Sequence, residues 1–407
     1  MRIFVLCQVY APEPTGVGQY MTEACESLVE RGHDVTVFTS ACGYEDPTIR
    51  FPGREERAGV HVRRFGLASF GKRGLFVRAA AAVLFGVHCL VAGLRGRRPD
   101  LVMFTTAPPM MGVFAILLAR LRSAPALFWA MDLNPDQLIV LGKLDSQGAM
   151  ARGLRMINRV IYGMCERIIA LDPHMAKRLI ESGAAPGKTM VSTLWPSDGG
   201  LQPINHEAND FRRRQDVGDH ILVMYSGNQT RSNPLQTLLD TALAMRADDR
   251  FRFFFIGGGT LKPEIENFRS SHGLTSVVIM PYQPREMLSE SLSAADIHAI
   301  TLGEGMVGVI HPCKIYNALA VGRPILYCGP PVSHVADILG RDRVGWAIRH
   351  GDVAGAVSAL QEFASLSAAD RRRLEVRCRT VVDERFSPAA LRDRFCELAE
   401  GVAGSGL

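Results

Sequence analysis

Several patterns that define metal and cofactor proteins are missing from this chain. None of the nine cysteines belongs to a Cys-x-x-Cys pair or to a Cys/His cluster with zinc spacing. No Asp-x-Asp motif occurs, which weakens the case for a site that holds a divalent cation. Because Cys7, Cys89 and Cys328 lie in apolar runs, we expect buried thiols and a reducing, cytoplasmic compartment.

Other protein classes are disfavoured by equally simple absences. The apolar start Met1–Leu6 is interrupted at once by Gln8 and by the sequence Tyr10-Ala11-Pro12, so it predicts a first strand and not a signal peptide. No helix-turn-helix or RNA-binding signature is present, and no short repeat or coiled coil is found. Nucleic acid is therefore not an expected partner.

The composition is that of a large globular protein. The chain has 407 residues, of which 47% are hydrophobic and 21% are charged, so two domains are expected. Strands and helices alternate twice along it, with a linker near residues 195–200, which indicates parallel sheets covered on both faces. We predict an α/β fold of two doubly wound, Rossmann-like domains facing a cleft: residues 1–196, residues 197–385, and a final helical segment, residues 386–407.

The segment 50–98 is strongly basic and contains a long apolar stretch. It carries eleven Lys or Arg residues against two acids, around an apolar run from Gly74 to Leu94. Arg78 and His88, with many Ala and Gly residues, argue against a transmembrane helix. A buried helix of an α/β domain is one interpretation, and a helix whose basic-flanked edge rests on an anionic membrane surface is the other.

Two loops of the first half could contact a ligand. Pro12–Gly18 follows the first strand and opens a helix, where Gly16 and Gly18 let a ligand approach the backbone. The loop is not Gly-x-Gly-x-x-Gly, which disfavours a dinucleotide site. Asp132 emerges at the end of a later strand and is the candidate acceptor-side carboxylate, whereas Asp136 is a candidate helix cap.

The second half offers glycine-rich loops next to cations. Gly227 and Asn228 follow its first strand, and Arg231 follows them at a predicted helix start, where a guanidinium could clamp a diphosphate. The turn Gly257–Gly259 precedes Lys262 in the first turn of the next predicted helix. Tyr282, after a further strand, is a candidate wall of a base pocket.

The stretch from His311 to Leu326 has the clearest pattern. Pro312 suits the first turn of a helix, Lys314 follows in that turn, and Gly322 ends the helix. A lysine beside a helix N-terminus at the carboxyl end of a sheet is a phosphate-binding arrangement. The glycine-rich loop before His311 contains Glu304, which could accept hydrogen bonds from hydroxyl groups.

Taken together, these motifs resemble a known family. The loop around Gly16, the turn Gly257–Lys262 and the block from Pro312 to Pro324 are similar to GT-B glycosyltransferases of family 4. The likeness is greatest to bacterial polysaccharide and O-antigen transferases of the colanic-acid and WbuB types. The Ala107-Pro108-Pro109 loop and the Asp132–Asp136 segment match that branch.

The resemblance implies a nucleotide-diphosphate sugar donor held by the second domain, retention of anomeric configuration and no essential metal. It also implies a saccharide acceptor, usually lipid-linked and facing the first domain, and a location at the inner face of the plasma membrane. Two positions depart from the family pattern, because Val309 and Asn317 stand where a pair of glutamates is often found.

On this reading, Lys314, Arg231 and Lys262 stabilise the departing diphosphate, while Asp132 orients or deprotonates the acceptor hydroxyl. The candidate catalytic residues are Asp132, Glu304 and Lys314. The candidate donor-binding residues are Gly16, Gly18, Gly227, Asn228, Arg231, Lys262, Tyr282 and His311. A non-hydrolysing sugar-nucleotide epimerase remains an alternative, as does a catalytically silent module that binds nucleotide sugars or lipid.

Overall fold

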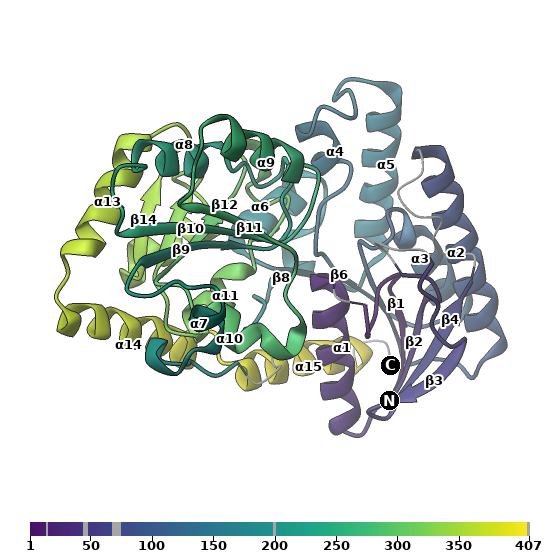
Figure 1. Ribbon diagram of the computed structural model, residues 1–407. Helices are drawn as coiled ribbons and strands as arrows, with labels where there is room; N and C mark the ends of the chain where they lie inside the picture. Colours follow the sequence, from purple (N-terminus) through teal and green to yellow (C-terminus); the bar gives the residue numbers. More distant parts are fainter. Residues whose placement is uncertain (14, 44–47, 67–74, 198–200, 405–407) are drawn as a thin grey trace. The chain divides into compact units, whose positions relative to one another are not determined.

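The computed structural model describes residues 1–13, 15–43, 48–66, 75–197 and 201–404, and these form two compact units (Figure 1). The first unit contains residues 1–193, 308–310 and 389–407, and the second contains residues 194–307 and 311–388. Lys72 and Arg73 of the basic segment lie outside the described residues, as do Asp198–Gly200 of the expected linker.

The first unit is built on an eight-stranded sheet with the order β3-β4-β2-β1-β5-β6-β7-β8. Its strands are β1 (Arg2–Leu6), β2 (Asp34–Ser40), β3 (Arg54–Arg57), β4 (Val60–Phe65), β5 (Leu101–Thr105), β6 (Ala126–Trp129), β7 (Arg167–Ala170) and β8 (Thr189–Val191). Its helices are α1 (Gly16–Glu30), α2 (Leu75–Arg95), α3 (Met111–Leu121), α4 (Asp136–Val140), α5 (Ala149–Met164), α6 (Pro173–Glu181) and α15 (Pro388–Gly404). All neighbouring strands are parallel except β3 and β4.

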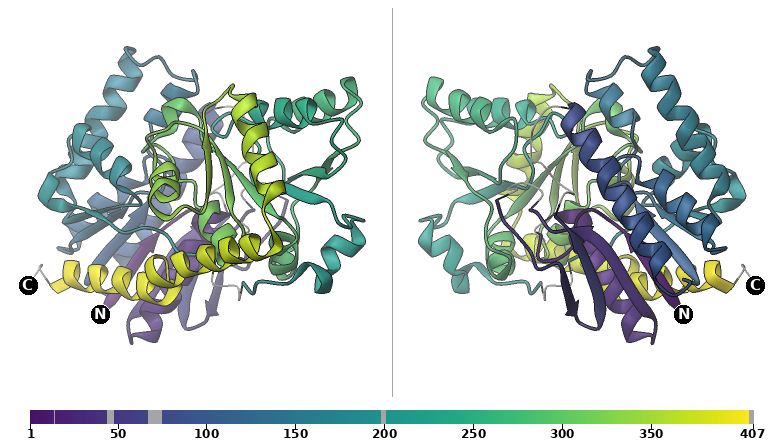
Figure 2. Two further views of the ribbon diagram at one scale, coloured as in Figure 1. Left: turned by 90° about the vertical axis from the view of Figure 1, so that its left-hand side faces the viewer. Right: turned by 90° about the vertical axis from the view of Figure 1, so that its right-hand side faces the viewer.

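The chain reverses its direction across this sheet between β1 and β5. Helix α1 connects β1 to β2 in one direction, while α3 connects β5 to β6 in the other, so right-handed crossovers place the two helices on opposite faces. Helices α2, α3 and α5 pack side by side (Figures 1 and 2). Glu400 of α15 pairs with Arg31 and His33, at the C-terminal end of α1.

The second unit has an entirely parallel sheet with the order β11-β10-β9-β12-β13-β14. The strands are β9 (Ile221–Ser226), β10 (Phe251–Ile256), β11 (Val277–Met280), β12 (Ile297–Thr301), β13 (Ile325–Cys328) and β14 (Gly345–Ile348). The helices are α7 (Asp210–Arg214), α8 (Gln236–Ala244), α9 (Lys262–Ser271), α10 (Leu288–Ser293), α11 (Lys314–Ala320), α12 (His334–Asp342), α13 (Val353–Ser365) and α14 (Ala368–Arg385).

Both faces of this second sheet are covered by apolar packing. Side chains such as Tyr225, Phe253 and Leu360 form the larger core, to which α8, α9 and α13 contribute. Phe211 and Phe254 belong to a smaller cluster on the other side of the strands, with residues next to α10. The strand order reverses between β9 and β12, and ligands of such sheets bind outside the carboxyl ends of the strands at this switch point.

The predicted α/β architecture with two parallel sheets is confirmed, and seven of the predicted strands have the predicted bounds, namely β4, β6, β7, β10, β11, β13 and β14. Strands β3 and β8 were missed because β3 is the polar edge sequence Arg54–Arg57 and β8 has only three residues. Two helices begin later than predicted: α8 starts at Gln236, and α11 starts at Lys314, so Pro312 precedes the helix. None of the helices in the described ranges is long and apolar enough to cross a membrane.

Candidate functional site

The most developed candidate site lies at the switch point of the second unit. The loop after β9 contains Gly227, Asn228 and Gln229, and the loop after β12 leads to Gly303. The two loops are joined where the Gly303 N–H donates to the carbonyl oxygen of Ser232 over 2.9 Å. The predicted glycine loop therefore stands at the sheet edge where ligands of parallel α/β domains bind.

Lys314 reaches this loop from the first position of α11. Its Nζ donates to the hydroxyl oxygen of Tyr225 over 2.7 Å and lies 3.9 Å from the centre of the Tyr225 ring. The Tyr225 hydroxyl donates in turn to the carbonyl oxygen of Asn228 over 2.6 Å. A Cβ on Gly227 would collide with the Lys314 side chain, and Gly227 has φ +136°, so this position requires glycine.

The lysine is held in surroundings that disfavour its charge. Burial lowers the pKa of Lys314 to about 8. Within the described ranges no carboxylate pairs with Lys314, and its contact with Tyr225 is a neutral hydroxyl and a ring face. A half-buried ammonium without a carboxylate partner is a binding point for an anion that enters the loop.

The turn after β10 packs directly on the Gly227 loop. The Gln229 N–H donates to the carbonyl oxygen of Gly258 over 2.7 Å, and a Cβ on Gly257 or Gly259 would collide with the backbone of this loop. Tyr282 lies against Gly257 and Gly258, with 48% of its surface exposed. The structure thus brings Tyr282, this glycine turn and the Lys314 loop into one continuous region of the second unit.

The two other predicted cations are placed less centrally. Lys262 is the first residue of α9, and its Nζ lies 3.8 Å from Glu266 at the surface. Arg231 is exposed in a turn five residues before α8 begins, so the predicted helix start at this position is wrong. Both cations border the glycine loops: Arg231 is exposed, and Lys262, like Lys314, is half-buried.

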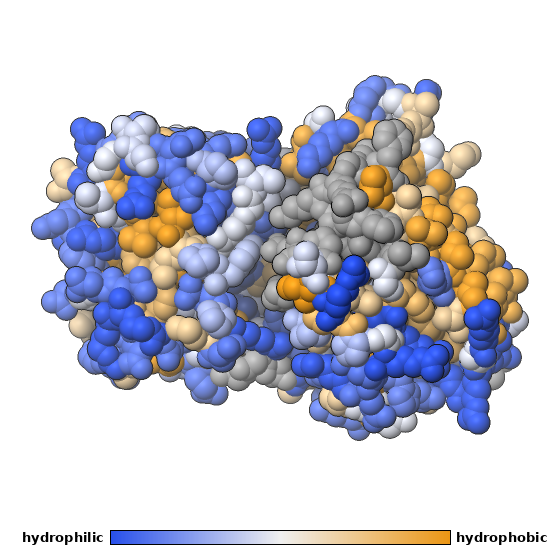
Figure 3. Space-filling view, turned by 45° about the vertical axis from the view of Figure 1, so that its right-hand side comes forward, coloured by the Kyte–Doolittle hydropathy of each residue, from blue (hydrophilic) through white to orange (hydrophobic). Residues whose placement is uncertain are grey.

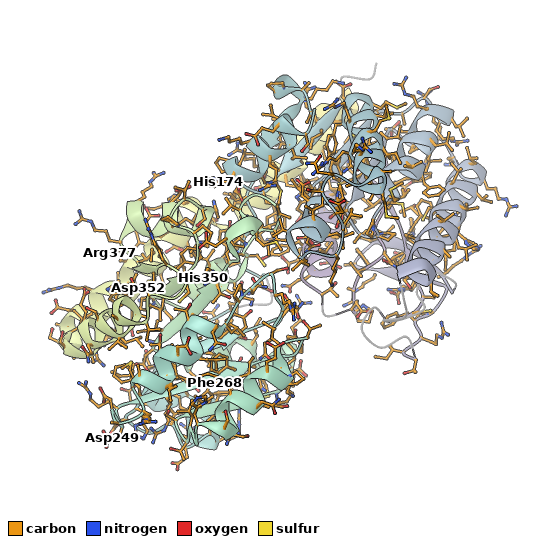
Figure 4. All side chains as sticks on the ribbon, turned by 90° about the horizontal axis from the view of Figure 1, so that it is seen from above. His174, Asp249, Phe268, His350, Asp352 and Arg377 are labelled. Atoms are coloured by element: carbon orange, nitrogen blue, oxygen red, sulfur yellow. The ribbon has the colours of Figure 1, made fainter. Side chains whose placement is uncertain are left out.

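Glu304 and His311 both lie in the connection between β12 and α11. Glu304 is exposed in a short 3-10 helix after β12. The base of this loop is held by His350, labelled in Figure 4, whose Nε2 donates to the carbonyl oxygen of Leu302 over 2.8 Å. His311 Nε2 lies 2.7 Å from the hydroxyl oxygen of Tyr316, which is 2.9 Å from His334 Nε2.

Asp132 lies in a separate site in the first unit. It follows β6 and lines a cavity of about 40 Å³ with Pro108, Asn134 and Tyr162. Its N–H donates to Thr106 Oγ1 over 3.2 Å, so the Asp132 segment and the Pro-Pro loop after β5 are linked. Asp136 begins α4 and pairs with Arg178 at 3.4 Å, which agrees with its predicted place at a helix start.

The glycines of the first unit have local explanations. Gly18 donates its N–H to Thr15, the N-cap of α1, and a Cβ at Gly18 would approach the Thr15 Oγ1 to 2.8 Å. A Cβ on Gly16 would meet nothing within 4 Å. The geometry therefore explains Gly18 by packing within its own loop, and it leaves space beside Gly16.

The two positions where glutamates were expected have clear structural roles. Val309 is fully buried in the first unit, where its carbonyl oxygen accepts from the Leu133 N–H over 2.8 Å. A glutamate at this buried position would lose the hydration of its carboxylate, which carries a large free-energy cost. Asn317 instead accepts the Ser197 N–H through its Oδ1 over 2.7 Å, which fastens the linker backbone.

Sequence reasoning missed Tyr225, the hydrogen-bond partner of Lys314, and it passed over Gln229 in the same loop. The available signal for Tyr225 was a hydroxyl-bearing side chain at the carboxyl end of a buried strand, immediately before a glycine loop. No pattern in the sequence indicates the hydrogen-bonded contacts from His311 through Tyr316 to His334, because His334 lies on a different helix, α12.

Two parallel-sheet units with these loops define a GT-B glycosyltransferase architecture. Sucrose-phosphate synthase from Thermosynechococcus elongatus superposes with a TM-score of 0.79 at 17% identity, covering 100% of both chains. HepE from Anabaena, solved with UDP-glucose, superposes with a TM-score of 0.71 at 12% identity, covering 98% of this chain and 100% of HepE.

The sequence comparisons agree with this fold. Residues 15–195 match the glycosyl transferase 4-like domain. The putative colanic acid biosynthesis glycosyl transferase WcaI of Escherichia coli K12 is 25% identical over 336 residues, which cover 79% of this chain and 82% of WcaI. The match over residues 15–195 and the similarity to WcaI support a family-4 type of glycosyltransferase with the GT-B fold, and they do not support the epimerase alternative.

Proposed function

We propose that this enzyme moves a sugar from a nucleotide-diphosphate donor to a hydroxyl group of a saccharide acceptor in cell-surface polysaccharide synthesis. The observation that carries the proposal is Lys314, a half-buried cation without a carboxylate partner among the described residues, at the switch point beside Gly227. Similarity to WcaI supports the pathway class, and similarity to HepE, solved with UDP-glucose, supports the donor class.

The second unit binds the donor. Lys314 takes the diphosphate, and Arg231 and Lys262 add positive charge at the border of the loops. The backbone near Gly227 and Gly257 allows the phosphates to come close, and Tyr282 offers an aromatic face to the base. As the bond between the anomeric carbon and the phosphate oxygen breaks, Lys314 stabilises the charge that develops on the leaving diphosphate.

The first unit supplies the acceptor side. Asp132 accepts the proton of the acceptor hydroxyl while the hydroxyl oxygen forms the new bond to the anomeric carbon. Attack from the face that the diphosphate leaves gives retention of configuration. The acceptor is a lipid-linked saccharide, and Glu304 in the second unit accepts hydrogen bonds from hydroxyls of the transferred sugar.

The reaction needs no metal, because Lys314 supplies the positive charge beside the leaving diphosphate that a divalent cation would otherwise supply. The test is incubation with UDP-, GDP-, ADP- and dTDP-sugars plus a membrane extract, with and without EDTA. Release of nucleoside diphosphate that depends on the extract, forms a glycolipid and survives EDTA supports the proposal. Donor epimerisation without an acceptor, or binding without turnover, contradicts it.

Donor binding is expected to depend on pH through Lys314. The pKa of Lys314 in the free enzyme is about 8, and a bound diphosphate raises it, so binding takes up a proton above pH 8. The donor dissociation constant should therefore be flat below pH 7 and rise by about tenfold per pH unit above pH 8. Calorimetry in buffers of different ionisation enthalpy measures the proton uptake directly. Donor binding without proton uptake at pH 8.5 would contradict the role of Lys314 as the diphosphate anchor.

We also propose that the first unit contacts the inner face of the plasma membrane. Exposed apolar residues gather on α2 and α3, and we call this surface the α2–α3 face (Figure 3). It consists of Val83, Leu84, Val87, Val91, Leu94, Val113, Leu117 and Leu121, which are 36–56% exposed. An apolar surface of this kind on adjacent helices is typical of a docking site.

The charges around the α2–α3 face favour an anionic bilayer as its partner. Arg95, Arg97, Arg98 and Arg120 lie on or next to these two helices and are exposed, and one acid, Asp100, follows α2. The Asp100 carboxylate accepts a hydrogen bond from the Arg2 N–H over 2.6 Å. Basic residues beside an apolar helix surface attract acidic headgroups while the apolar side chains enter the interface. The membrane contact predicted from residues 50–98 of the sequence therefore also includes α3.

Replacing Arg95, Arg97 and Arg98 together with serine should weaken sedimentation with phosphatidylglycerol vesicles by roughly 100-fold, at about 1 kcal/mol for each charge. All three side chains are exposed at the end of α2. The matched control replaces Arg372, Arg373 and Arg377 on α14, the last of which is labelled in Figure 4. Equal sedimentation of the first variant and the wild-type enzyme would remove the electrostatic part of the proposal.

A further inference from the structure

The side chain of Tyr162 is buried without a hydrogen-bond partner for its hydroxyl. Tyr162 lies on α5 and is 4% exposed, and no group of the described residues bonds to its hydroxyl oxygen. Burial raises the pKa of this hydroxyl well above its usual value, so it keeps its proton and remains a hydrogen-bond donor. Because buried hydroxyls are usually paired, this one calls for a ligand or a water molecule beside it.

The packing around Tyr162 does not require a hydroxyl. Its ring continues a row of aromatic rings, in which the centres of Phe104 and Phe128 are 4.9 Å apart and those of Phe128 and Tyr162 are 6.0 Å apart. Both pairs are stacked, with interplanar angles of 16° and 18°. Phenylalanine at position 162 would complete the same row without the cost of burying an unpaired polar group. The packing of the core therefore leaves the hydroxyl itself unexplained.

Tyr162 and Asp132 line the same cavity of the first unit. The row of three buried rings forms the floor of this cavity. Its rim is made of residues that keep part of their surface in solvent, namely Thr106, Pro109, Asp132 and Asn158. The cavity thus opens toward solvent on the side of Asp132, and it admits a small group without a change in the backbone.

The cavity is large enough for one small substituent of a sugar and too small for a sugar ring. Its volume is about 40 Å³. A single water molecule needs roughly 10–15 Å³ of such space. The amide of Asn158 at the rim is used locally, because its Nδ2 donates to the carbonyl oxygen of Asn134 over 2.5 Å. A carboxylate at the rim and a hydroxyl donor at the floor suit a substituent that carries an oxygen acceptor.

We propose that Tyr162 is an acceptor-binding residue, whose hydroxyl donates a hydrogen bond to the oxygen of a small substituent of the acceptor sugar, beside the hydroxyl group that Asp132 deprotonates. This inference rests on the proposed function. The aromatic floor covers the carbon atoms of the substituent, and the hydrogen bond selects which hydroxyl of the sugar faces Asp132. The contact is the same in the ground state and in the transition state, so it contributes to acceptor binding and not to the chemical step.

The test replaces Tyr162 with phenylalanine and compares the acceptor kinetics with those of the wild-type enzyme. The donor is the nucleotide sugar that supports transfer among UDP-, GDP-, ADP- and dTDP-sugars, and the acceptor is a dilution series of the glycolipid fraction of the membrane extract. The ratio of the two KM values then needs no absolute acceptor concentration. The matched control is Thr241→Val on α8, which removes a buried hydroxyl that already donates to the carbonyl oxygen of Thr237 over 2.6 Å.

We expect Tyr162→Phe to raise the KM for the acceptor by about tenfold, with kcat and the donor dissociation constant unchanged and a melting temperature equal to that of the wild-type enzyme or higher. Thr241→Val should melt at a lower temperature and keep the wild-type KM. An acceptor KM of Tyr162→Phe within twofold of wild type, or a loss of kcat alone, would overturn the inference and leave the proposed function standing. Absence of transfer by the wild-type enzyme with all four donors would reject both.

Discussion

Replacing Lys314 with methionine is expected to lower the rate of sugar transfer by about 10²–10³-fold, the usual loss when one group that stabilises developing negative charge is removed. Methionine retains most of the volume beside Tyr225 and removes a half-buried charge that the fold keeps at some cost. The melting temperature should therefore be unchanged or higher. Release of nucleoside diphosphate under saturating donor and acceptor measures the effect.

The matched control is Lys262→Met, at a lysine that begins α9 in the same unit. Lys262 is paired with Glu266 at 3.8 Å and is 36% exposed in its side chain, so its removal should cost less than tenfold. A Lys314→Met enzyme with wild-type turnover, or one that loses no more activity than Lys262→Met, would show that the half-buried lysine does not serve the leaving group. A pH profile of Lys314→Arg adds a second check, because an arginine stays charged above pH 8.

Replacing Asp132 with asparagine is expected to lower turnover by about 10²–10⁴-fold, the range for loss of a general base. The backbone at this position is held by the bond from its N–H to Thr106, which the substitution leaves intact. Donor binding should not change, because the donor loops belong to the second unit. The effect is measured as turnover at saturating donor, with the donor dissociation constant measured in parallel.

Asp136→Asn provides the control for Asp132. It removes a carboxylate four residues along the same segment that is paired with Arg178 at 3.4 Å, so a stability loss without a specific loss of turnover is expected. Should Asp132→Asn retain full turnover while Asp136→Asn loses it, the assignment of the two carboxylates would have to be reversed. Loss of donor affinity in Asp132→Asn would also speak against an acceptor-side role.

The fold could be read from the sequence because buried parallel strands leave a strong pattern. Ile325–Cys328 is continuously apolar, and Phe251–Ile256 is apolar apart from Arg252; both have the predicted bounds. Helix ends were harder to predict than strands. Helix α8 begins only at Gln236, and the preceding turn contains Pro234, a residue that also suits the first turn of a helix. Edge strands such as β3 carry no apolar pattern at all.

The site could be predicted only as far as single residues beside loops. Lys314 and Gly227 were recognisable because a cation and a glycine stood at the carboxyl ends of strands. Their contact joins residues 87 positions apart in the sequence and depends on α11 packing against β12 and β13, which a single sequence does not reveal. The buried amide of Gln229 and the partner role of Tyr225 depend on burial and distance in the same way.

The measurement that tests the account most directly is calorimetric titration of UDP-, GDP-, ADP- and dTDP-sugars into the wild-type enzyme and Lys314→Met, with EDTA present. The account predicts that the wild-type enzyme binds at least one donor with a dissociation constant in the micromolar to millimolar range typical of enzyme substrates, and that Lys314→Met binds it at least tenfold more weakly. Absence of binding to all four donors, or equal affinity of the two enzymes, would contradict the assignment of Lys314 as the donor-diphosphate anchor.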